Sequence, residues 1–146
     1  MSEEAPGYRN HLQRLLTGKG GVREIGNWHA KVLKGLPWAA IESVKARAEL
    51  TDAEVSRLLG ISEATLRRGR VAAGRLDAAT GDRLYRLSKV LALAISVLEG
   101  EQPALSWMRR GQPGLGGQVP LDLLVTQAGA DEVEALLGRL EHGVYA

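Results

Sequence analysis

The sequence contains no cysteine and no phenylalanine, and only three tryptophans and three tyrosines occur among its 146 residues. Without cysteine the chain can form neither disulfides nor a cysteine-built zinc site, which fits a reducing compartment. Leucine, valine, isoleucine and alanine must therefore fill the core, and these residues suit helices. The length allows one core, or two small lobes that share one.

The chain also lacks the residue patterns of a catalyst. Its histidines, His11, His29 and His142, show no metal-ligand spacing such as HExxH, and no cysteine can act as a nucleophile. Carboxylates gather between residues 131 and 141, but complementing the dipole at a helix start explains them without catalysis. We therefore expect no catalytic residue, no metal site, no cofactor and no enzymatic activity.

Long hydrophobic runs are absent as well. The longest apolar stretch covers residues 90–98, contains Ser96, and is well short of the roughly 18 residues that a membrane-spanning helix needs. No signal peptide is recognisable. The sequence thus predicts a soluble, cytoplasmic protein without a membrane partner.

The net charge of +2 is too small to imply a polyanionic partner, but its distribution is uneven. Between residues 67 and 89 seven basic residues accompany two acidic ones, whereas residues 131–141 hold four acidic residues and Arg139 alone. Such asymmetry predicts two surfaces with different partners. The alternative is a set of solvated helix faces whose signs are random.

Residues 50–74, LTDAEVSRLLGISEATLRRGRVAAG, have the pattern of two short helices joined by a tight turn. Thr51 and Glu54 can form a capping box at the start of the first helix. Gly60 suits the left-handed conformation that ends a helix, and Ser62 can cap the second one. Only about three residues then separate the helices, which is the spacing of a helix-turn-helix.

The second helix of this motif carries the residues that we expect to contact DNA. In a helix-turn-helix it enters the major groove, where some side chains reach base edges and others hold phosphates. Arginine binds guanine through a bidentate fork, and serine or threonine can bond several bases. The candidate DNA-binding residues are Ser62, Thr65, Arg67, Arg68 and Arg70. An ordinary helical hairpin with solvated arginines is the alternative.

Gly69 departs from the pattern of a good recognition helix. A glycine inside a helix costs roughly 1 kcal/mol relative to alanine and supplies no side chain to pack. This residue puts the orientation of the helix, and with it the affinity for DNA, in question.

Helical periodicity recurs on both sides of the motif, and no strand pattern is found. The expected helices cover about residues 11–16, 37–48, 77–100, 103–111, 120–126 and 131–143. Acidic residues should occupy the first turn of the last helix. The predicted organisation is a partly flexible N-terminal extension (1–36), a helix-turn-helix region (37–76), and a connecting helix with a C-terminal domain (77–146).

Several spaced motifs follow the helix-turn-helix: Asp82-Arg83-Leu84 with Leu87, the Trp107 segment, Pro113 with Leu115-Gly116-Gly117, Pro120-Leu121 with Leu124, and LGRLEHG at 137–143. With these motifs in this order, residues 50–146 resemble the Xre/MbcA/ParS antitoxins, partners of RES-domain toxins in bacterial type II toxin-antitoxin pairs. The resemblance implies an all-α fold, with an Xre-like helix-turn-helix bundle followed by a helical toxin-binding domain.

The resemblance also implies a function. Toxins of this family consume NAD or transfer ADP-ribose from it, so the antitoxin would occlude the active site of its cognate RES-domain toxin. Such antitoxins typically repress their own operon, and a homodimer or a larger toxin-antitoxin hetero-oligomer would place recognition helices on operator DNA. The alternative is a stand-alone helix-turn-helix transcriptional regulator whose C-terminal helices serve dimerisation or bind a small ligand.

On this interpretation the toxin-contacting segment lies at the end of the last helix. Its candidate residues are Glu141, His142, Gly143, Val144 and Tyr145. A pocket for an anionic dinucleotide should be electropositive, so carboxylates would complement it. For His142 and Gly143, simple helix termination is an equal alternative, because glycine is enriched just past helix ends.

Overall fold

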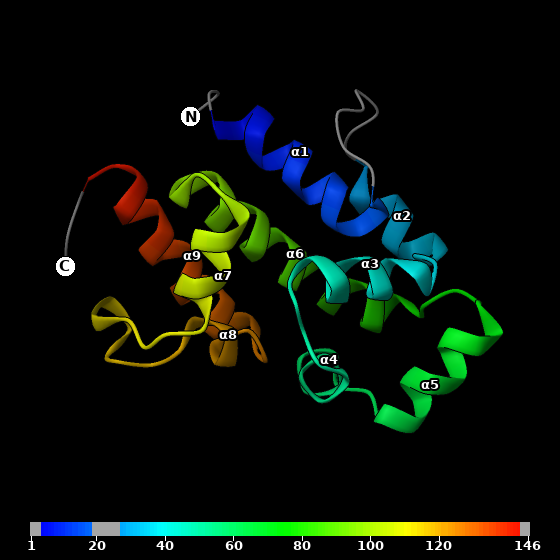
Figure 1. The fold of residues 1–146 in the computed structure, drawn as a ribbon. Helices are drawn as coiled ribbons and strands as arrows, with labels where there is room; N and C mark the ends of the chain where they lie inside the picture. Colours follow the sequence, from blue (N-terminus) through cyan, green and yellow to red (C-terminus); the bar gives the residue numbers. More distant parts are fainter. Residues whose placement is uncertain (1–3, 19–26, 144–146) are drawn as a thin grey trace.

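The computed structural model describes residues 4–18 and 27–143, and every regular element in these residues is a helix (Figure 1). The elements are α1 (Glu4–Thr17), α2 (Trp28–Lys34), α3 (Ala39–Arg47), α4 (Asp52–Leu59), α5 (Glu63–Ala72), α6 (Ala78–Leu98), α7 (Glu101–Met108), the 3-10 turn η1 (Pro113–Leu115), α8 (Pro120–Leu123) and α9 (Gln127–Glu141). The predicted all-α fold is confirmed.

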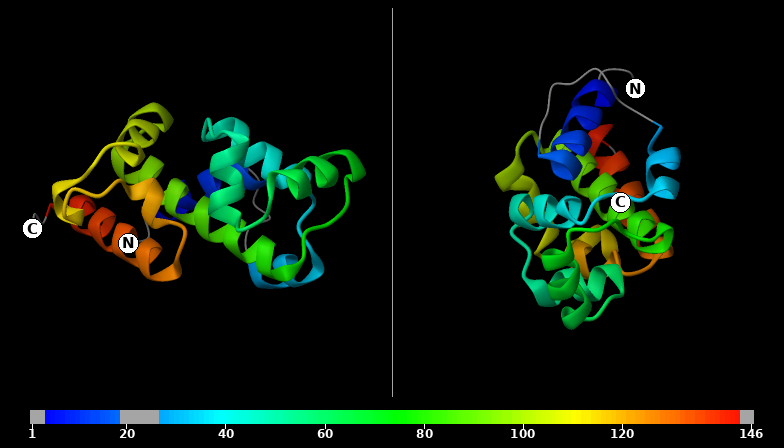
Figure 2. Two further views of the ribbon diagram at one scale, coloured as in Figure 1. Left: turned by 90° about the horizontal axis from the view of Figure 1, so that it is seen from below. Right: turned by 90° about the vertical axis from the view of Figure 1, so that its right-hand side faces the viewer.

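Helix α6 is the central element of the fold. It begins after Asp77, whose side chain accepts a hydrogen bond from the backbone N–H of Thr80 at 2.9 Å, and it ends where Glu99 turns left-handed. Helices α1, α2, α4, α7 and α9 all pack against it. Figure 2 shows α3–α5 and α7–α9 at opposite ends of the molecule, with α6 between them. In the structure this helix runs between the two halves, whose buried residues form one hydrophobic core.

The N-terminal segment contributes more to this core than its sequence predicts. Helix α1 is longer than the expected short helix, and its Leu12, Leu15 and Leu16 are buried against α3 and α6. Helix α2, which has no counterpart among the expected helices, packs on α6 and places Trp28 beside Tyr85, with 6.1 Å between ring centroids. Seven residues are too few for a clear periodic signal, which explains why α2 was missed.

The start of α9 corrects another expectation. The helix begins at Gln127, after Thr126 caps it by accepting from the N–H of Gly129 at 2.9 Å. The carboxylates of residues 131, 132 and 134 therefore lie beyond the first turn, and the helix-start explanation for them is wrong. Gly129 falls in the gap between the expected helices 120–126 and 131–143, but it lies inside α9 at a close-packed position, because a Cβ there would lie 1.9 Å from the Leu123 carbonyl oxygen.

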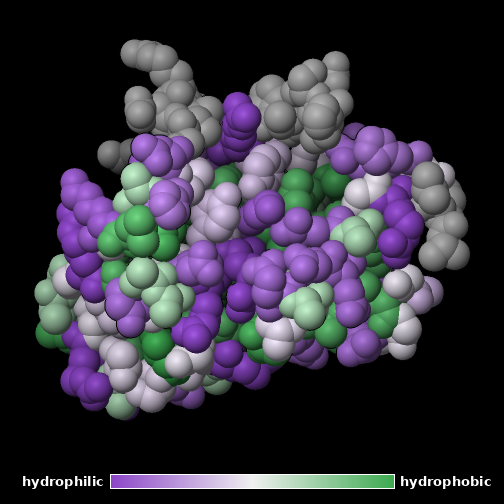
Figure 3. Space-filling view, turned by 180° about the vertical axis from the view of Figure 1, so that it is seen from behind, coloured by the Kyte–Doolittle hydropathy of each residue, from purple (hydrophilic) through white to green (hydrophobic). Residues whose placement is uncertain are grey.

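The surface carries its apolar residues in small groups. Figure 3, which views the molecule from behind, shows them interspersed with hydrophilic residues. Among the described residues, no helix is both long and apolar enough to cross a membrane. The same residues contain no group of three or more histidines and carboxylates that could hold a metal ion.

Candidate DNA-binding and toxin-binding surfaces

Helices α4 and α5 form the predicted helix-turn-helix, with the predicted caps. The Thr51 hydroxyl accepts from the N–H of Glu54 at 3.1 Å, and the Thr51 N–H donates to the Glu54 carboxylate at 2.9 Å. Gly60 ends α4 with φ 70°, in the left-handed region. Ser62 then caps α5 by accepting from the N–H of Thr65 at 3.0 Å. Each helix-start and helix-end signal expected at Thr51, Gly60 and Ser62 is therefore present in the structure.

The buried side of α5 explains Gly69. A Cβ at this position would lie 2.3 Å from two carbons of the Trp38 ring, so only glycine lets α5 approach that ring so closely. Leu66, one turn earlier, is fully buried. The backbone N–H of Trp38 donates to the backbone carbonyl of Gly74 at 3.0 Å. The glycine that costs helix propensity thus allows tight packing against Trp38 and helps to hold the orientation of α5.

Two of the three candidate arginines share one exposed face of α5, and Arg70 is also exposed but lies to one side of that face. At about 100° per residue, Ala64, Arg67, Arg68 and Val71 lie within roughly 100° of one another on the helix surface. Arg67 and Arg68 are exposed, and Val71 is 87% exposed. The Thr65 hydroxyl accepts from Arg68 at 3.1 Å. This face therefore presents two cations away from the core.

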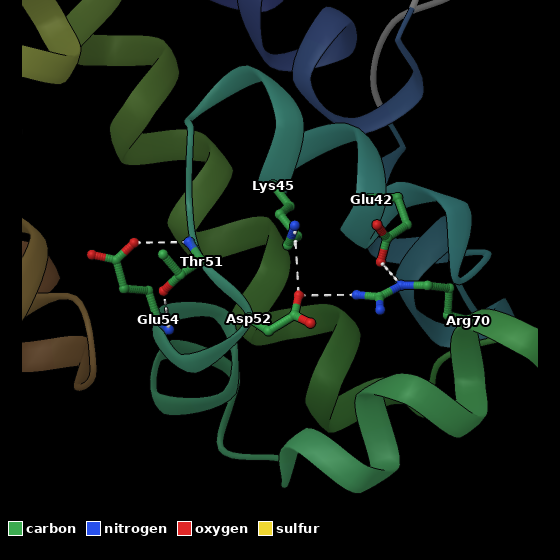
Figure 4. A network of polar contacts seen from close by, with 6 residues as sticks. All are labelled: Glu42, Lys45, Thr51, Asp52, Glu54 and Arg70. Carbon is green, nitrogen blue, oxygen red and sulfur yellow. Dashed lines mark hydrogen bonds and ion pairs between the residues drawn. The ribbon is translucent and has the colours of Figure 1, made fainter.

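Arg70 has a different environment from its two neighbours (Figure 4). Its Nε donates to Glu42 of α3 at 2.8 Å, and its Nη2 donates to Asp52 of α4 at 3.0 Å. The Lys45 ammonium lies 3.5 Å from the same Asp52 oxygen. The hydrogen bond from Arg70 is the main cause that lowers the pKa of the Asp52 carboxyl. Arg70 therefore differs from the other candidate DNA-binding arginines by the two carboxylates, Glu42 and Asp52, that its guanidinium bonds within the protein.

A second set of ion pairs connects the helix-turn-helix to the C-terminal helices. Arg109, at the end of α7, donates to both carboxylate oxygens of Glu54 at 2.7 and 3.0 Å, and also to the Glu49 carbonyl at 3.0 Å. The hydrogen bond from Arg109 is the largest cause lowering the pKa of Glu54, to about 2. A further ion pair joins Arg47 of α3 to Glu101 of α7 at 3.1 Å. Sequence reasoning missed these contacts, because partners more than 50 residues apart leave no local pattern.

The end of α9, where the described candidate toxin-binding residues 141–143 lie, is at the far end of the molecule from α5 (Figure 1). Glu141, His142 and Gly143 are exposed together where α9 ends. His142 Nε2 lies 3.9 Å from a carboxylate oxygen of Glu141. This contact is an ion pair only when the histidine is protonated. Gly143 has φ 71°, a conformation that favours glycine. Val144 and Tyr145 lie outside the described residues.

The acidic residues of α9 divide into two kinds. The carboxylate of Glu134 lies 3.7 Å from the ammonium of Lys89, so Glu134 forms an ion pair with α6. Asp131 and Glu132 are exposed, and Asp131 accepts from Gln127 at 2.8 Å. The exposed surface of α9 thus keeps an acidic character, opposite in sign to the exposed face of α5.

A capped basic helix-turn-helix, joined through α6 to a separate set of helices with an acidic surface, defines the class of two-part helix-turn-helix proteins. Residues 28–89 match the antitoxin Xre-like helix-turn-helix domain, and residues 93–143 match the antitoxin Xre/MbcA/ParS C-terminal toxin-binding domain. The chain therefore belongs to the Xre/MbcA/ParS family of antitoxins, and the resemblance found in its sequence is confirmed.

Three relatives carry the name Antitoxin Xre. One from Yersinia enterocolitica is 37% identical over 107 residues, which cover 73% of this chain and 72% of the relative. One from Photorhabdus laumondii is 30% identical over 112 residues, 76% of each chain. One from Pseudomonas putida is 25% identical over 139 residues, 93% of this chain and 84% of the relative. The two family models together span both halves of the chain, and the family points to a regulatory antitoxin.

Proposed function

We propose that this antitoxin neutralises a RES-domain, NAD-consuming or ADP-ribosylating toxin by placing the end of α9 in the toxin's active site. The observation that carries the proposal is the joint exposure of Glu141, His142 and Gly143 at the end of a helix whose Val133, Leu136 and Leu137 are buried in the core. Val144 and Tyr145 follow directly in the sequence and would extend the same segment.

The charge of this surface supports the proposal. A cleft that binds an anionic dinucleotide is expected to be electropositive, and complementary charge favours fast and specific association. Asp131 and Glu132 are exposed in the first half of α9 and give this helix negative charge, and Glu141, whose side chain is 26% exposed, adds a carboxylate at its end. The basic face of α5, at the other end of the molecule, would stay free for a second partner.

We propose that this second partner is the operator DNA of the antitoxin's own operon. Arg67 and Arg68 occupy the exposed face of a capped helix in the position that enters a major groove in helix-turn-helix proteins. A homodimer, or a hetero-oligomer with the toxin, would present two such helices to half-sites about 34 Å apart.

We call the segment from residue 141 onward the plug. Its role is tested by co-expressing this protein with the RES-type product of the neighbouring gene and measuring cellular NAD. A chain truncated after His142 should let NAD fall, because it lacks the segment that fills the cleft, whereas the full chain should hold NAD. Circular dichroism should show equal helix content for both chains. If the truncated chain still protects NAD and binds the toxin equally well, the plug model is wrong.

Operator binding is tested with Arg68→Ala. This variant should weaken binding to the DNA upstream of the gene and spare toxin neutralisation, because residue 68 is exposed at the end far from α9. Losing a phosphate contact should also reduce the salt dependence by about one charge. Equal damage to both activities would instead indicate misfolding and would argue against two separate surfaces.

A further inference from the structure

The guanidinium of Arg70 joins three helices. It extends from α5, donates through Nε to Glu42 on α3, and donates through Nη2 to Asp52 on the first turn of α4. Figure 4 shows Arg70 pointing to both carboxylates, with Lys45 above Asp52 and directed to the same Asp52 oxygen. The four residues form one continuous network of alternating charge.

We propose that Arg70 is a positioning residue that sets the angle of the recognition helix, and that it does not itself contact DNA. The inference rests on the proposed binding of DNA by α5. Two adjacent donors of one planar fork bond carboxylates on two different helices, so the distances from α5 to both α3 and α4 are defined together. A lysine cannot reproduce this, because its ammonium is a single point charge on a flexible chain.

The place of Arg70 on α5 fits this role. Counting about 100° per residue, Arg70 lies roughly 100° from the centre of the face that holds Arg67 and Arg68, and next to the buried Leu66. Its neighbour Gly69 is pressed against Trp38. The ring and the two ion pairs attach the second half of α5 at adjacent points, and attachment at two points opposes rotation about either one.

The competing explanation is that Arg70 leaves its partners and binds a phosphate. The two explanations predict opposite effects for the double variant Glu42→Gln/Asp52→Asn. Removing two negative charges close to DNA should strengthen binding if Arg70 is thereby released to the phosphates. If the network positions α5, the same variant should weaken binding. Glu63→Gln, which removes one exposed carboxylate from α5 outside the network, is the matched control and should bind slightly more tightly.

The experiment measures the affinity for a labelled duplex from the region upstream of the gene over a series of KCl concentrations. Arg67→Gln and Arg68→Gln should each reduce the salt slope by about 1, as expected for lost phosphate or base contacts. Arg70→Gln should weaken binding about fivefold with the slope unchanged, the scale of partly exposed ion pairs. Arg70→Lys should be impaired to a similar extent, and Arg70→Gln should add little to the Glu42→Gln/Asp52→Asn variant.

The proposal is overturned if Arg70→Gln reduces the salt slope by about 1, if Arg70→Lys binds normally, or if the double carboxylate variant binds more tightly. Failure of the wild-type protein to bind the duplex, with or without its toxin, would instead count against the proposed operator function. Amide hydrogen exchange then decides on the positioning role: Arg70→Gln should speed exchange in α5 and leave α9 unchanged. Equal exchange rates in α5 would refute it.

Discussion

The close contact between Trp38 and Gly69 predicts that Gly69→Ala will change the stability of the protein in opposite directions with and without the Trp38 ring. Gly69→Ala should destabilise the protein, although alanine is the better helix former by roughly 1 kcal/mol. The added Cβ would lie 2.3 Å from two carbons of the Trp38 ring, well inside van der Waals contact. Forcing a group into such a space typically costs about 1–3 kcal/mol, and this distance places the cost near the upper end. We therefore expect a net loss of about 2 kcal/mol.

Trp38→Ala provides the background in which the same substitution should change sign. With the ring removed, Gly69→Ala meets no clash and should stabilise the protein by up to about 1 kcal/mol through helix propensity. Urea unfolding of the four proteins gives the effect of Gly69→Ala on the free energy of unfolding in each of the two backgrounds. Circular dichroism at 222 nm is the signal, because one tryptophan is removed. The reasoning is refuted if Gly69→Ala stabilises the protein while Trp38 is present, or has equal effects in both backgrounds.

Two further predictions concern stability. Because the folded pKa of Glu54 is lowered to about 2, its pairing with Arg109 contributes stability that is present above the unfolded pKa of about 4.3 and is lost as pH falls from there toward 2. Glu54→Gln should therefore cost on the order of 1 kcal/mol at pH 7 and much less near pH 2, and a cost independent of pH would contradict the ion pair. Gly129→Ala should destabilise α9 by about 3 kcal/mol or more, because its Cβ would meet a backbone carbonyl that cannot move aside. Gly138→Ala, in the same helix with nothing within 4 Å, is the control and should stabilise by up to about 1 kcal/mol; thermal unfolding that shifts equally in both variants would refute the packing argument.

Features encoded by neighbouring residues were predictable from the sequence. The capping box of Thr51 and Glu54, the left-handed Gly60 and the cap at Ser62 lie within four residues of the groups that they bond, and all three are present. The same holds for Asp77 at the start of α6. Such signals define where helices begin and end, and they located the helix-turn-helix before any tertiary contact was known.

Glycines show where this reasoning fails. Gly60 was correctly interpreted, because its conformational role is local. In the sequence Gly69 is only a cost to helix propensity and Gly129 falls in the gap between two expected helices. In the structure both lie inside helices, at points where another part of the chain approaches too closely for a side chain. Whether a glycine ends a helix or permits such an approach depends on residues distant in the sequence, which one local pattern does not contain.

The first turn of α4 shows why the candidate site could be only partly predicted. Asp52 and Glu54 stand two residues apart at a helix start, where carboxylates are favoured in any case, so their local role is sufficient to explain them in the sequence. In the fold, Asp52 accepts from Arg70 of α5, while Glu54 accepts from Arg109 at the end of α7. One turn of helix thus has ion-pair partners in both halves of the molecule. Arg70, which looked equivalent to Arg67 and Arg68 in the sequence, differs from them only because α3 and α4 place carboxylates within its reach.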